Sequence, residues 1–356
     1  MATAKSAKFA TVEEVLKHPA FPTSTWRLVP TRSGRLPVAE GRGGPLKISW
    51  EIHGSGPIKI AFIMGLGSFK TSWQRQTLYF GHEHGDKYSV LIMDNRGMGE
   101  SDHPILRYST SEMALDALEV FDHAGWSADR SVHIVGVSMG GMISQELGCA
   151  APQRLASLTL LSTAAEINGQ DKGFVQNLRN RAALLVPRGV EVSVRSGAER
   201  IFPHHWLAAP DDARLPARGT PGVEMPDDGA GEYGLFGTNY ERFVAQEMHK
   251  RAHSGFTTPG FLLQLIAAGW HHKSREQLTK MADEVGRERI TVLHGTTDEM
   301  ISLAHGKVLI DAIQPKYAII LEDLGHAVPM ERTAWLHSML EDHIREAEEL
   351  GTAPVK

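Results

Sequence analysis

The sequence predicts an α/β fold, a doubly wound and mostly parallel sheet interrupted by a mainly helical insertion. Short apolar runs alternate with helical patterns up to residue 162, the alternation stops at about residue 165, and it returns at residue 290. Strand–helix–strand alternation requires parallel strands joined by right-handed crossovers. The predicted organisation is an N-terminal arm on the core (1–44), a core made from two stretches (45–164 and 275–356), and a helical cap, or lid, between them (165–274).

The predicted strands follow from runs of apolar residues. Residues 46–54 place apolar side chains on one face and turn at Gly54, which indicates a half-buried antiparallel strand. The later runs are short and mostly apolar, as expected of strands buried on both faces of a parallel sheet. These runs are 58–64, 88–94, 132–137, 155–162, 290–295 and 317–323.

Helices are predicted where apolar residues recur at helical spacing. In the core they are expected over 109–126, from Met139, from about Leu303 and from about Glu331. In the insertion the patterns lie around 174–186, 190–202, 239–252 and 259–270. Residues 207–237 interrupt them and are dense in Pro, Gly and Asp. An irregular stretch of this length favours a functional lid or a mobile loop over a core connection.

The composition is ordinary for a soluble globular protein: 42% of the 356 residues are hydrophobic and 22% are charged. The net charge of −5 gives no electrostatic case for a nucleic-acid or anionic-membrane partner. No apolar stretch approaches the roughly 20 residues of a membrane span, and the N-terminus lacks the apolar core of a secretory signal. We therefore expect a cytoplasmic protein. A single cysteine, Cys149, excludes an internal disulfide and is expected to have a packing role.

The stretch "GVSMGG" carries the first sign of chemistry. Gly136 and Gly140 lie two residues either side of Ser138, the G-x-S-x-G pattern, directly after a predicted strand. This spacing suits a serine on a sharp, strained strand-to-helix turn, where a Cβ at either glycine would clash. A serine hydroxyl becomes a nucleophile only when a base takes its proton, and that base is usually a histidine oriented by a carboxylate.

Two loops after the insertion offer these groups. Asp298 follows the strand "ITVLHG", and His326 follows the next strand directly after Gly325. The chain order of serine, acid and histidine is the one associated with the strand–turn–helix serine. Glu322, Asp323 and Glu166 compete with Asp298 for the role of the acid.

A serine nucleophile also needs two backbone N–H groups for the oxyanion that forms on attack. One is expected from Met139, because the first-turn amides of a helix lack intrahelical partners and the helix dipole favours negative charge there. The other is expected from the loop "MGLGS" after the strand 58–64, with Leu66 as the best candidate.

These motifs resemble those of the α/β-hydrolases. The resemblance rests on five ordered stretches, which are "MGLGS", "DNRGMGESD", "GVSMGG", "HGTTDEM" and "GHAVPMER". Within that superfamily the chain is most similar to the esterase branch that includes polyketide methylesterases and enol-lactonases. Many members open the first loop with His-Gly, and Met64 replaces that histidine here. The difference matters little, because the expected donor is the Leu66 amide.

Other polar motifs are interpreted as structural. The stretch that contains Asp94 and Arg96 resembles the family's structural loop after the fourth strand. A buried ion pair or a hydrogen-bonded turn is expected there. The glycine-rich stretches "GLGSFK" and "RGMGES" lack the residues that complete nucleotide-binding fingerprints. The pairs His204–His205 and His271–His272 have no cysteine or carboxylate companion at metal-ligand spacing. Neither a metal nor another cofactor is expected.

The resemblance implies a serine hydrolase that cleaves an ester, thioester or lactone through an acyl-enzyme, with Ser138, Asp298 and His326 as its triad. Acyl transfer and carbon–carbon bond cleavage by the same triad stay open, as does a non-catalytic binding protein on this fold. The size of the lid suggests a medium-to-large apolar small molecule as the substrate, by analogy with the fold alone. The lid residues expected to contact it are Trp206, Phe236, Tyr240 and Trp270. The protein is expected to be a monomer or a homodimer.

Overall fold

The computed structural model describes residues 9–167, 189–226 and 231–351. In these residues eight strands form one sheet in the order β1-β2-β4-β3-β5-β6-β7-β8. Their bounds are β1 Arg32–Val38, β2 Leu46–His53, β3 Ile58–Ile63, β4 Tyr88–Met93, β5 Val132–Val137, β6 Leu155–Leu161, β7 Ile290–Gly295 and β8 Tyr317–Leu321. Only the pairings of β2 with β1 and with β4 are antiparallel, so the predicted mostly parallel α/β sheet is confirmed.

The edge strand β1 differs from the prediction, which assigned its residues to an arm. It pairs with β2 along its whole length, from Arg32 opposite Ile52 to Val38 opposite Leu46. Its sequence, RSGRLPV, contains a glycine and a proline and shows no apolar alternation, so its pairing with β2 rather than its own pattern makes it a strand. A proline is tolerated here because β1 lies at the sheet edge.

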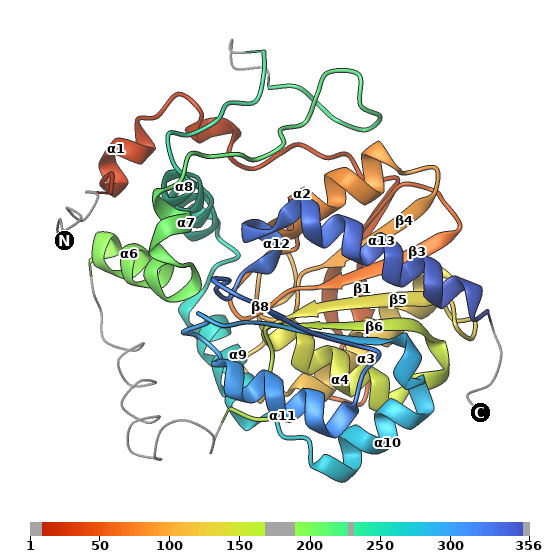
Figure 1. The fold of residues 1–356 in the computed structure, drawn as a ribbon. Coiled ribbons are helices and arrows are strands. Elements are labelled where there is room, and N and C mark those ends of the chain that lie inside the picture. The colour runs from red at the N-terminus through yellow and green to blue at the C-terminus, as the bar shows by residue number, and fades with distance from the viewer. Residues whose placement is uncertain (1–8, 168–188, 227–230, 352–356) are drawn as a thin grey trace.

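Helices cover both faces of the sheet, which makes it doubly wound (Figure 1). One face is packed by α3 (Thr110–Ala124), α4 (Met139–Ala150), α10 (Arg275–Val285) and α11 (Leu303–Ile313). The other face is packed by α2 (Gln74–Gln76), the helical segment η3 (Thr77–Glu83), α12 (Val328–Glu331) and α13 (Thr333–Glu349). Short 3₁₀ turns are η1 (Phe21–Thr23), η2 (Lys70–Trp73), η4 (Pro152–Arg154) and η5 (Arg287–Arg289).

The insertion contributes α6 (Val190–Ile201), α7 (His204–Ala208), α8 (Asn239–Ala252) and α9 (Thr258–Trp270). The helices predicted around 190–202, 239–252 and 259–270 are thus present, whereas the one predicted around 174–186 lies outside the described residues. The N-terminal helix α1 (Val12–Leu16) lies beside α6, α7 and α8 (Figure 1). Phe9, Val12 and Val15 share a hydrophobic cluster with these helices, so this part of the arm packs on the insertion rather than on the sheet.

The irregular stretch between α7 and α8 is held by specific contacts in its described part. The Arg242 guanidinium contacts the Asp211 carboxylate at 2.6 Å, and both side chains are buried. Val223 forms an isolated β-bridge with Leu28 of the N-terminal segment. These contacts join the described part of the stretch to α8 and to the N-terminal segment.

Among the described residues, no helix combines the length and the apolar character that crossing a membrane would require. Cys149 lies in the last turn of α4, partly buried against the hydrophobic core. Burial raises the pKa of its thiol, as the expected packing role implies.

Candidate active site

Ser138 occupies a strained turn between β5 and α4. Its backbone has φ 58° and ψ −124°, a conformation that L-residues rarely adopt outside functional sites. The flanking glycines explain how the turn fits. A Cβ on Gly136 would lie 2.3 Å from the Ser144 Oγ, and one on Gly140 would lie 2.1 Å from the Ile63 carbonyl oxygen. The predicted strand-to-helix serine turn is therefore present.

The glycine loop after β3 lies against this serine. A Cβ on Gly65 would approach the Ser138 Cβ to 3.1 Å and its Oγ to 3.6 Å. Leu66 follows Gly65 and is partly buried against the core, and Met139 is the first residue of α4. Met139 thus follows Ser138 directly, and Leu66 follows the glycine that lies against the Ser138 side chain.

The glycine loop is fixed at both of its ends. The Asn95 side-chain amide donates a hydrogen bond of 2.9 Å to the Met64 carbonyl oxygen. The Gly67 amide donates one of 2.9 Å to the Gln264 Oε1 of α9. Neither Asn95 nor Gln264 was predicted as a site residue. Each bonds a backbone atom, and a contact with the backbone produces no recognisable residue pattern in the sequence.

His326 and Asp298 meet beyond β8 and β7. The His326 Nδ1 and the Asp298 Oδ2 are 2.7 Å apart, and Asp298 is 5% exposed. The other carboxylate oxygen, Oδ1, accepts hydrogen bonds of 2.9 Å from the amides of Met300 and Ile301. With its Nδ1 facing the carboxylate, the imidazole presents Nε2 on its opposite side.

The electrostatics of Asp298 favour its ionised form. Burial alone would raise the pKa of this carboxyl group, but the charge of His326 and hydrogen bonds from His294 and His326 lower it far below its ordinary value. The His294 Nε2 lies 3.4 Å from the Asp298 Oδ2. An ionised, oriented carboxylate is what a histidine base requires, because it stabilises the imidazolium that forms when the base accepts a proton.

The backbone around His326 is held by Glu331 and by the insertion. The Glu331 carboxylate accepts hydrogen bonds from the amides of Gly325, at 2.9 Å, and Ala327, at 3.0 Å. The His326 amide donates to the Ile201 carbonyl oxygen of α6, at 2.7 Å. Burial raises the pKa of Glu331 to about 7, although the two amide bonds oppose the shift. Glu331 was not among the predicted site residues, although the sequence pattern that identifies it is an acidic residue six positions after Gly325.

The three loops converge through shared apolar packing. One hydrophobic cluster contains Val137, which precedes Ser138, together with Leu324 and Val328, which flank His326. Met64, at the start of the glycine loop, packs against the same cluster. The strands β5, β6, β7 and β8 are mutually parallel, so the loops after them lie at one edge of the sheet.

The competing acids lie elsewhere. Glu166 pairs with His272, with 3.7 Å between the Oε2 and Nε2 atoms. Glu322 and Asp323 are exposed, although they are closer to His326 in sequence than Asp298 is. Asp298 is therefore the carboxylate that the structure brings to His326.

The loop after β4 has the structural contacts that were expected of it. The Asp94 carboxylate accepts hydrogen bonds from the amides of Lys70, at 2.7 Å, and Glu100, at 3.0 Å. The Arg96 guanidinium forms two hydrogen bonds, of 2.6 and 2.7 Å, with the Asp116 carboxylate, and both side chains are buried. These contacts tie the loop to η2 and α3 rather than presenting free groups to a ligand.

Four lid residues, Trp206, Phe236, Tyr240 and Trp270, are expected to contact substrate, and this expectation stays a prediction. The first three are buried in the cluster shared by the insertion and the N-terminal segment. Trp206 stacks on Phe202 and Tyr240 stacks on Phe9, each pair with ring centroids 4.4 Å apart. Packing within this cluster therefore surrounds these three side chains.

Trp270 differs from the other three because 62% of its surface is exposed. The guanidinium of Arg107 lies 4.8 Å from the centroid of its ring.

The paired histidines do not form a metal site. His204 and His205 are exposed on α7, whereas His271 is buried with its Nδ1 2.9 Å from the Thr110 Oγ1. In the part of the chain that the structure describes, no group of three or more histidine, cysteine, aspartate or glutamate side chains has metal-binding geometry.

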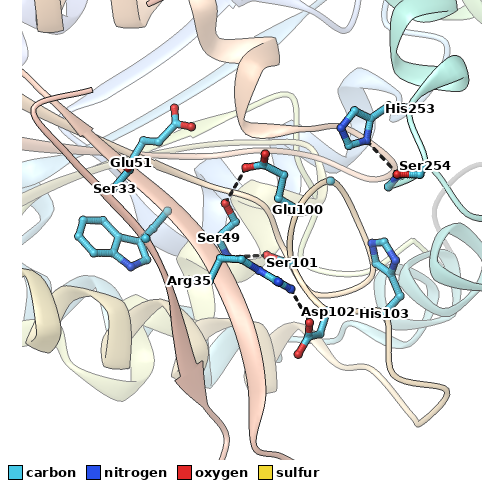
Figure 2. Close-up of a pocket in the computed structure, with 14 residues that line it drawn as sticks. Ser33, Arg35, Ser49, Glu51, Glu100, Ser101, Asp102, His103, His253 and Ser254 are labelled. Atoms are coloured by element: carbon cyan, nitrogen blue, oxygen red, sulfur yellow. Dashed lines mark hydrogen bonds and ion pairs between the residues drawn. The ribbon is translucent and has the colours of Figure 1, made fainter. Parts of the chain in front are cut away.

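A separate polar cavity of about 760 Å³ lies between the β1–β2 edge, the loop after β4 and the residues preceding α9 (Figure 2). Carboxylates, histidines and serines surround it, including Glu51, Glu100, His103 and His253. Ser138, Asp298 and His326 are not among its lining residues. This cavity is therefore distinct from the candidate active site.

Comparison with known proteins agrees with the geometry. A family model described as the alpha/beta hydrolase fold matches residues 65–333. Rhodomycin D methylesterase DnrP of Streptomyces peucetius is 41% identical over 255 residues, which are 68% of this chain and 76% of that protein. 3-Oxoadipate enol-lactonase 2 of Acinetobacter baylyi is 31% identical over 143 residues, which are 40% of this chain and 49% of the lactonase.

Several curated relatives are matched over only part of their length. The chain spans 60%, 49% and 40% of three of them, all below two thirds. Among solved structures, a thermophilic esterase from Thermogutta terrifontis has a TM-score of 0.64 and 19% identity, over 89% of this chain and 99% of that one. At this identity the likeness concerns the fold. Because the family model spans the loops that hold Ser138, Asp298 and His326, we conclude that the chain belongs to the α/β-hydrolase family.

Proposed function

We propose that this chain is a serine hydrolase that cleaves a carboxylic ester, thioester or lactone through an acyl-enzyme. The observation that carries the proposal is the 2.7 Å contact between His326 and the buried Asp298. It lies at the C-terminal ends of the parallel strands, where Ser138 occupies a strained turn. A methylesterase and an enol-lactonase among the relatives support this class of bond. The proposed substrate is a medium-to-large apolar small molecule, by analogy with such relatives.

In the proposed mechanism the Ser138 Oγ attacks the substrate carbonyl carbon while the His326 Nε2 accepts the hydroxyl proton. Asp298 stays ionised and stabilises the imidazolium. The carbonyl oxygen becomes an oxyanion that accepts hydrogen bonds from the amides of Leu66 and Met139. When the carbon–oxygen or carbon–sulfur bond of the leaving group breaks, His326 returns the proton to the leaving group and the acyl group remains on Ser138.

The second half of the cycle uses water as the nucleophile. His326 takes a proton from water, the hydroxide attacks the acyl-enzyme carbonyl, and the Ser138 oxygen leaves with the proton that His326 gives back. The products are the carboxylic acid and the free enzyme. A strained backbone at Ser138 suits both halves, because it holds the side-chain oxygen clear of the helix that follows.

The test is hydrolysis of p-nitrophenyl esters, from acetate to laurate, by the wild-type protein, Ser138→Ala and the exposed-serine control Ser338→Ala. We expect the wild type and the control to hydrolyse at least one ester and to be labelled by a fluorophosphonate, and Ser138→Ala to lose both properties. A wild-type protein that neither turns over nor is labelled contradicts the proposal. Labelling with transfer of the acyl group to an added alcohol, and no hydrolysis, identifies an acyltransferase instead.

A further inference from the structure

Gln264 joins two core loops from a position inside the insertion. It lies on α9 and its side chain is 0% exposed. Its Oε1 accepts a hydrogen bond from the Gly67 amide, and its Nε2 donates one to the Arg96 carbonyl oxygen, both at 2.9 Å. A buried side-chain amide with both ends satisfied is rigid, because moving it would leave polar atoms unpaired.

The first of these bonds constrains the proposed oxyanion donor. With the Met64 carbonyl bonded to Asn95 and the Gly67 amide bonded to Gln264, only Gly65 and Leu66 lie between the two anchors. The orientation of the Leu66 amide depends on the peptide planes on either side of it. The same bond occupies the Gly67 amide, so this amide does not compete with that of Leu66 for the oxyanion.

Packing reinforces the contact between α9 and the loops. Gly67 has φ +66°, and a Cβ there would lie 2.7 Å from the Phe261 ring of α9. A Cβ on Gly260 would lie 2.0 Å from the Gly97 carbonyl oxygen. The helix thus touches the glycine loop and the loop after β4 with no space for an additional methyl group, so α9 cannot shift without disturbing both.

We propose that Gln264 is a positioning residue for the reaction: through the Gly67 amide it fixes the glycine loop so that the Leu66 N–H meets the developing oxyanion. The inference rests on the proposed serine-hydrolase function and deepens it. Gln264 itself touches no reacting atom. Its contribution is made in the transition state, because the ground-state carbonyl oxygen places a weaker demand on the position of the donor.

The test compares Gln264→Met with Gln74→Met. The Gln74 side chain is also buried and also bridges two backbone groups, with its Oε1 accepting from the Trp26 amide at 2.9 Å and its Nε2 donating to the Ser24 carbonyl at 3.1 Å. Each substitution removes one accepted and one donated hydrogen bond of the same kind. For Gln264→Met we expect kcat to fall roughly 10- to 100-fold with KM within about threefold, whereas Gln74→Met keeps the wild-type values.

A second readout separates positioning from general destabilisation. Affinity for a trifluoromethyl ketone of the preferred acyl chain, which forms a tetrahedral adduct with Ser138, is expected to fall in parallel with kcat for Gln264→Met alone. A folded Gln264→Met with wild-type kcat and wild-type ketone affinity overturns the inference, as does an equal loss in Gln74→Met. If Gln264→Met does not fold, Gln264→Asn, whose side chain is too short to reach both loops, carries the same expectation.

The failure of this inference is distinguishable from the failure of the proposed function. A wild-type protein that is not labelled at Ser138 removes the proposed function. A labelled and active wild type, with a Gln264→Met variant that behaves like Gln74→Met, removes only the positioning role.

Discussion

Two buried carboxylates follow parallel strands of the same sheet, and their partners differ in kind. Asp94, after β4, accepts hydrogen bonds from two backbone amides and contacts the Lys70 ammonium at 3.1 Å. Asp298, after β7, also accepts hydrogen bonds from two backbone amides, but its side-chain contact is with the imidazole of His326. Each carboxylate accepts two backbone amide hydrogen bonds, one on each oxygen of Asp94 and both on the Oδ1 of Asp298, and the side-chain partners differ in kind. A lysine partner forms a permanent ion pair that fixes the loop, whereas a histidine partner can accept and release a proton.

The charge around Lys70 supports this distinction. Burial alone would lower the pKa of its ammonium group, but Asp94, Glu51 and Glu100 raise it above its ordinary value. Lys70 therefore keeps its charge near neutral pH, and its ion pair with Asp94 undergoes no protonation change there. The partner of Asp298 is instead an imidazole, the side chain that most often acts as a general base.

The largest expected effect is the contrast between Asp298→Asn and Asp94→Asn. We expect Asp298→Asn to lower kcat by roughly 10³- to 10⁴-fold with little loss of stability, because an amide favours the wrong tautomer of His326. Asp94→Asn is expected to destabilise the protein while the folded fraction keeps kcat within about threefold of the wild type. The measurements are ester hydrolysis and urea unfolding on the same samples of both variants. Equal losses of kcat in the two variants would contradict the distinction between the two carboxylates.

Next in size is the ion pair on the same loop after β4. Arg96→Met removes two hydrogen bonds from the buried Asp116 carboxylate and leaves it the 3.3 Å contact with Arg42. We expect a loss of about 3–5 kcal/mol in the free energy of unfolding. The control is Arg35→Met, since Arg35 contacts Asp102 at 2.5 Å in an exposed pair worth about 0–1 kcal/mol. A similar loss in both variants would show that burial does not set the value of these pairs.

A third prediction concerns Glu331, which holds the His326 loop through backbone amides. Burial raises its pKa from the ordinary 4.5 to about 7, so between those values the native state binds more protons than the unfolded state. This group should therefore lower the stability of the wild type as pH rises through that window, by on the order of 3 kcal/mol. Urea unfolding at several pH values should show a smaller decline for Glu331→Gln.

The same variant sharpens the comparison in its activity. A glutamine cannot accept from both the Gly325 and the Ala327 amides, because its NH₂ group faces one of them, so kcat is expected to fall about tenfold. The control is Glu341→Gln, whose carboxylate accepts from Tyr79 and Tyr88 on the α13 side of the sheet. If Glu331→Gln keeps wild-type kcat, the His326 loop is held by its other contacts.

The smallest effect is expected at Ser101, which completes the loop after β4. Its Oγ donates to the Asp94 carbonyl oxygen at 2.6 Å and accepts from the Ser49 amide at 2.9 Å. Ser101→Ala should cost about 1–2 kcal/mol of unfolding free energy without changing kcat. A fall in kcat larger than the stability loss explains would mean that this loop does take part in catalysis.

Residue patterns predicted the candidate triad because each member closes a local motif. Ser138 lies between two glycines, and Asp298 and His326 each follow a buried strand. Gln264 could not be found in this way, since its partners are backbone atoms of loops far away in the sequence. Glu331 acts on the backbone too, but it lies six residues after Gly325 within the stretch "GHAVPMER", so a residue pattern was available for it.

The parts of the fold that were not predicted share a physical cause. β1 (Arg32–Val38) lacks apolar alternation because it is an edge strand that depends on β2 for its pairing. Tyr240 lies in the helix predicted around 239–252, whereas Trp206 lies in α7, which no predicted helix covers. Periodicity shows that a face is covered, and only the tertiary structure shows by what.

The packing of the N-terminal segment on the insertion limits how this protein can be recombined with its relatives. Phe9, Val12 and Val15 complete the apolar cluster of α6, α7 and α8, although some 170 residues of chain separate them. A chimaera that transplants residues 189–274 alone onto another hydrolase core would expose this apolar surface to water. Exchange of this insertion as a cassette would therefore require two non-contiguous pieces of the chain to move together.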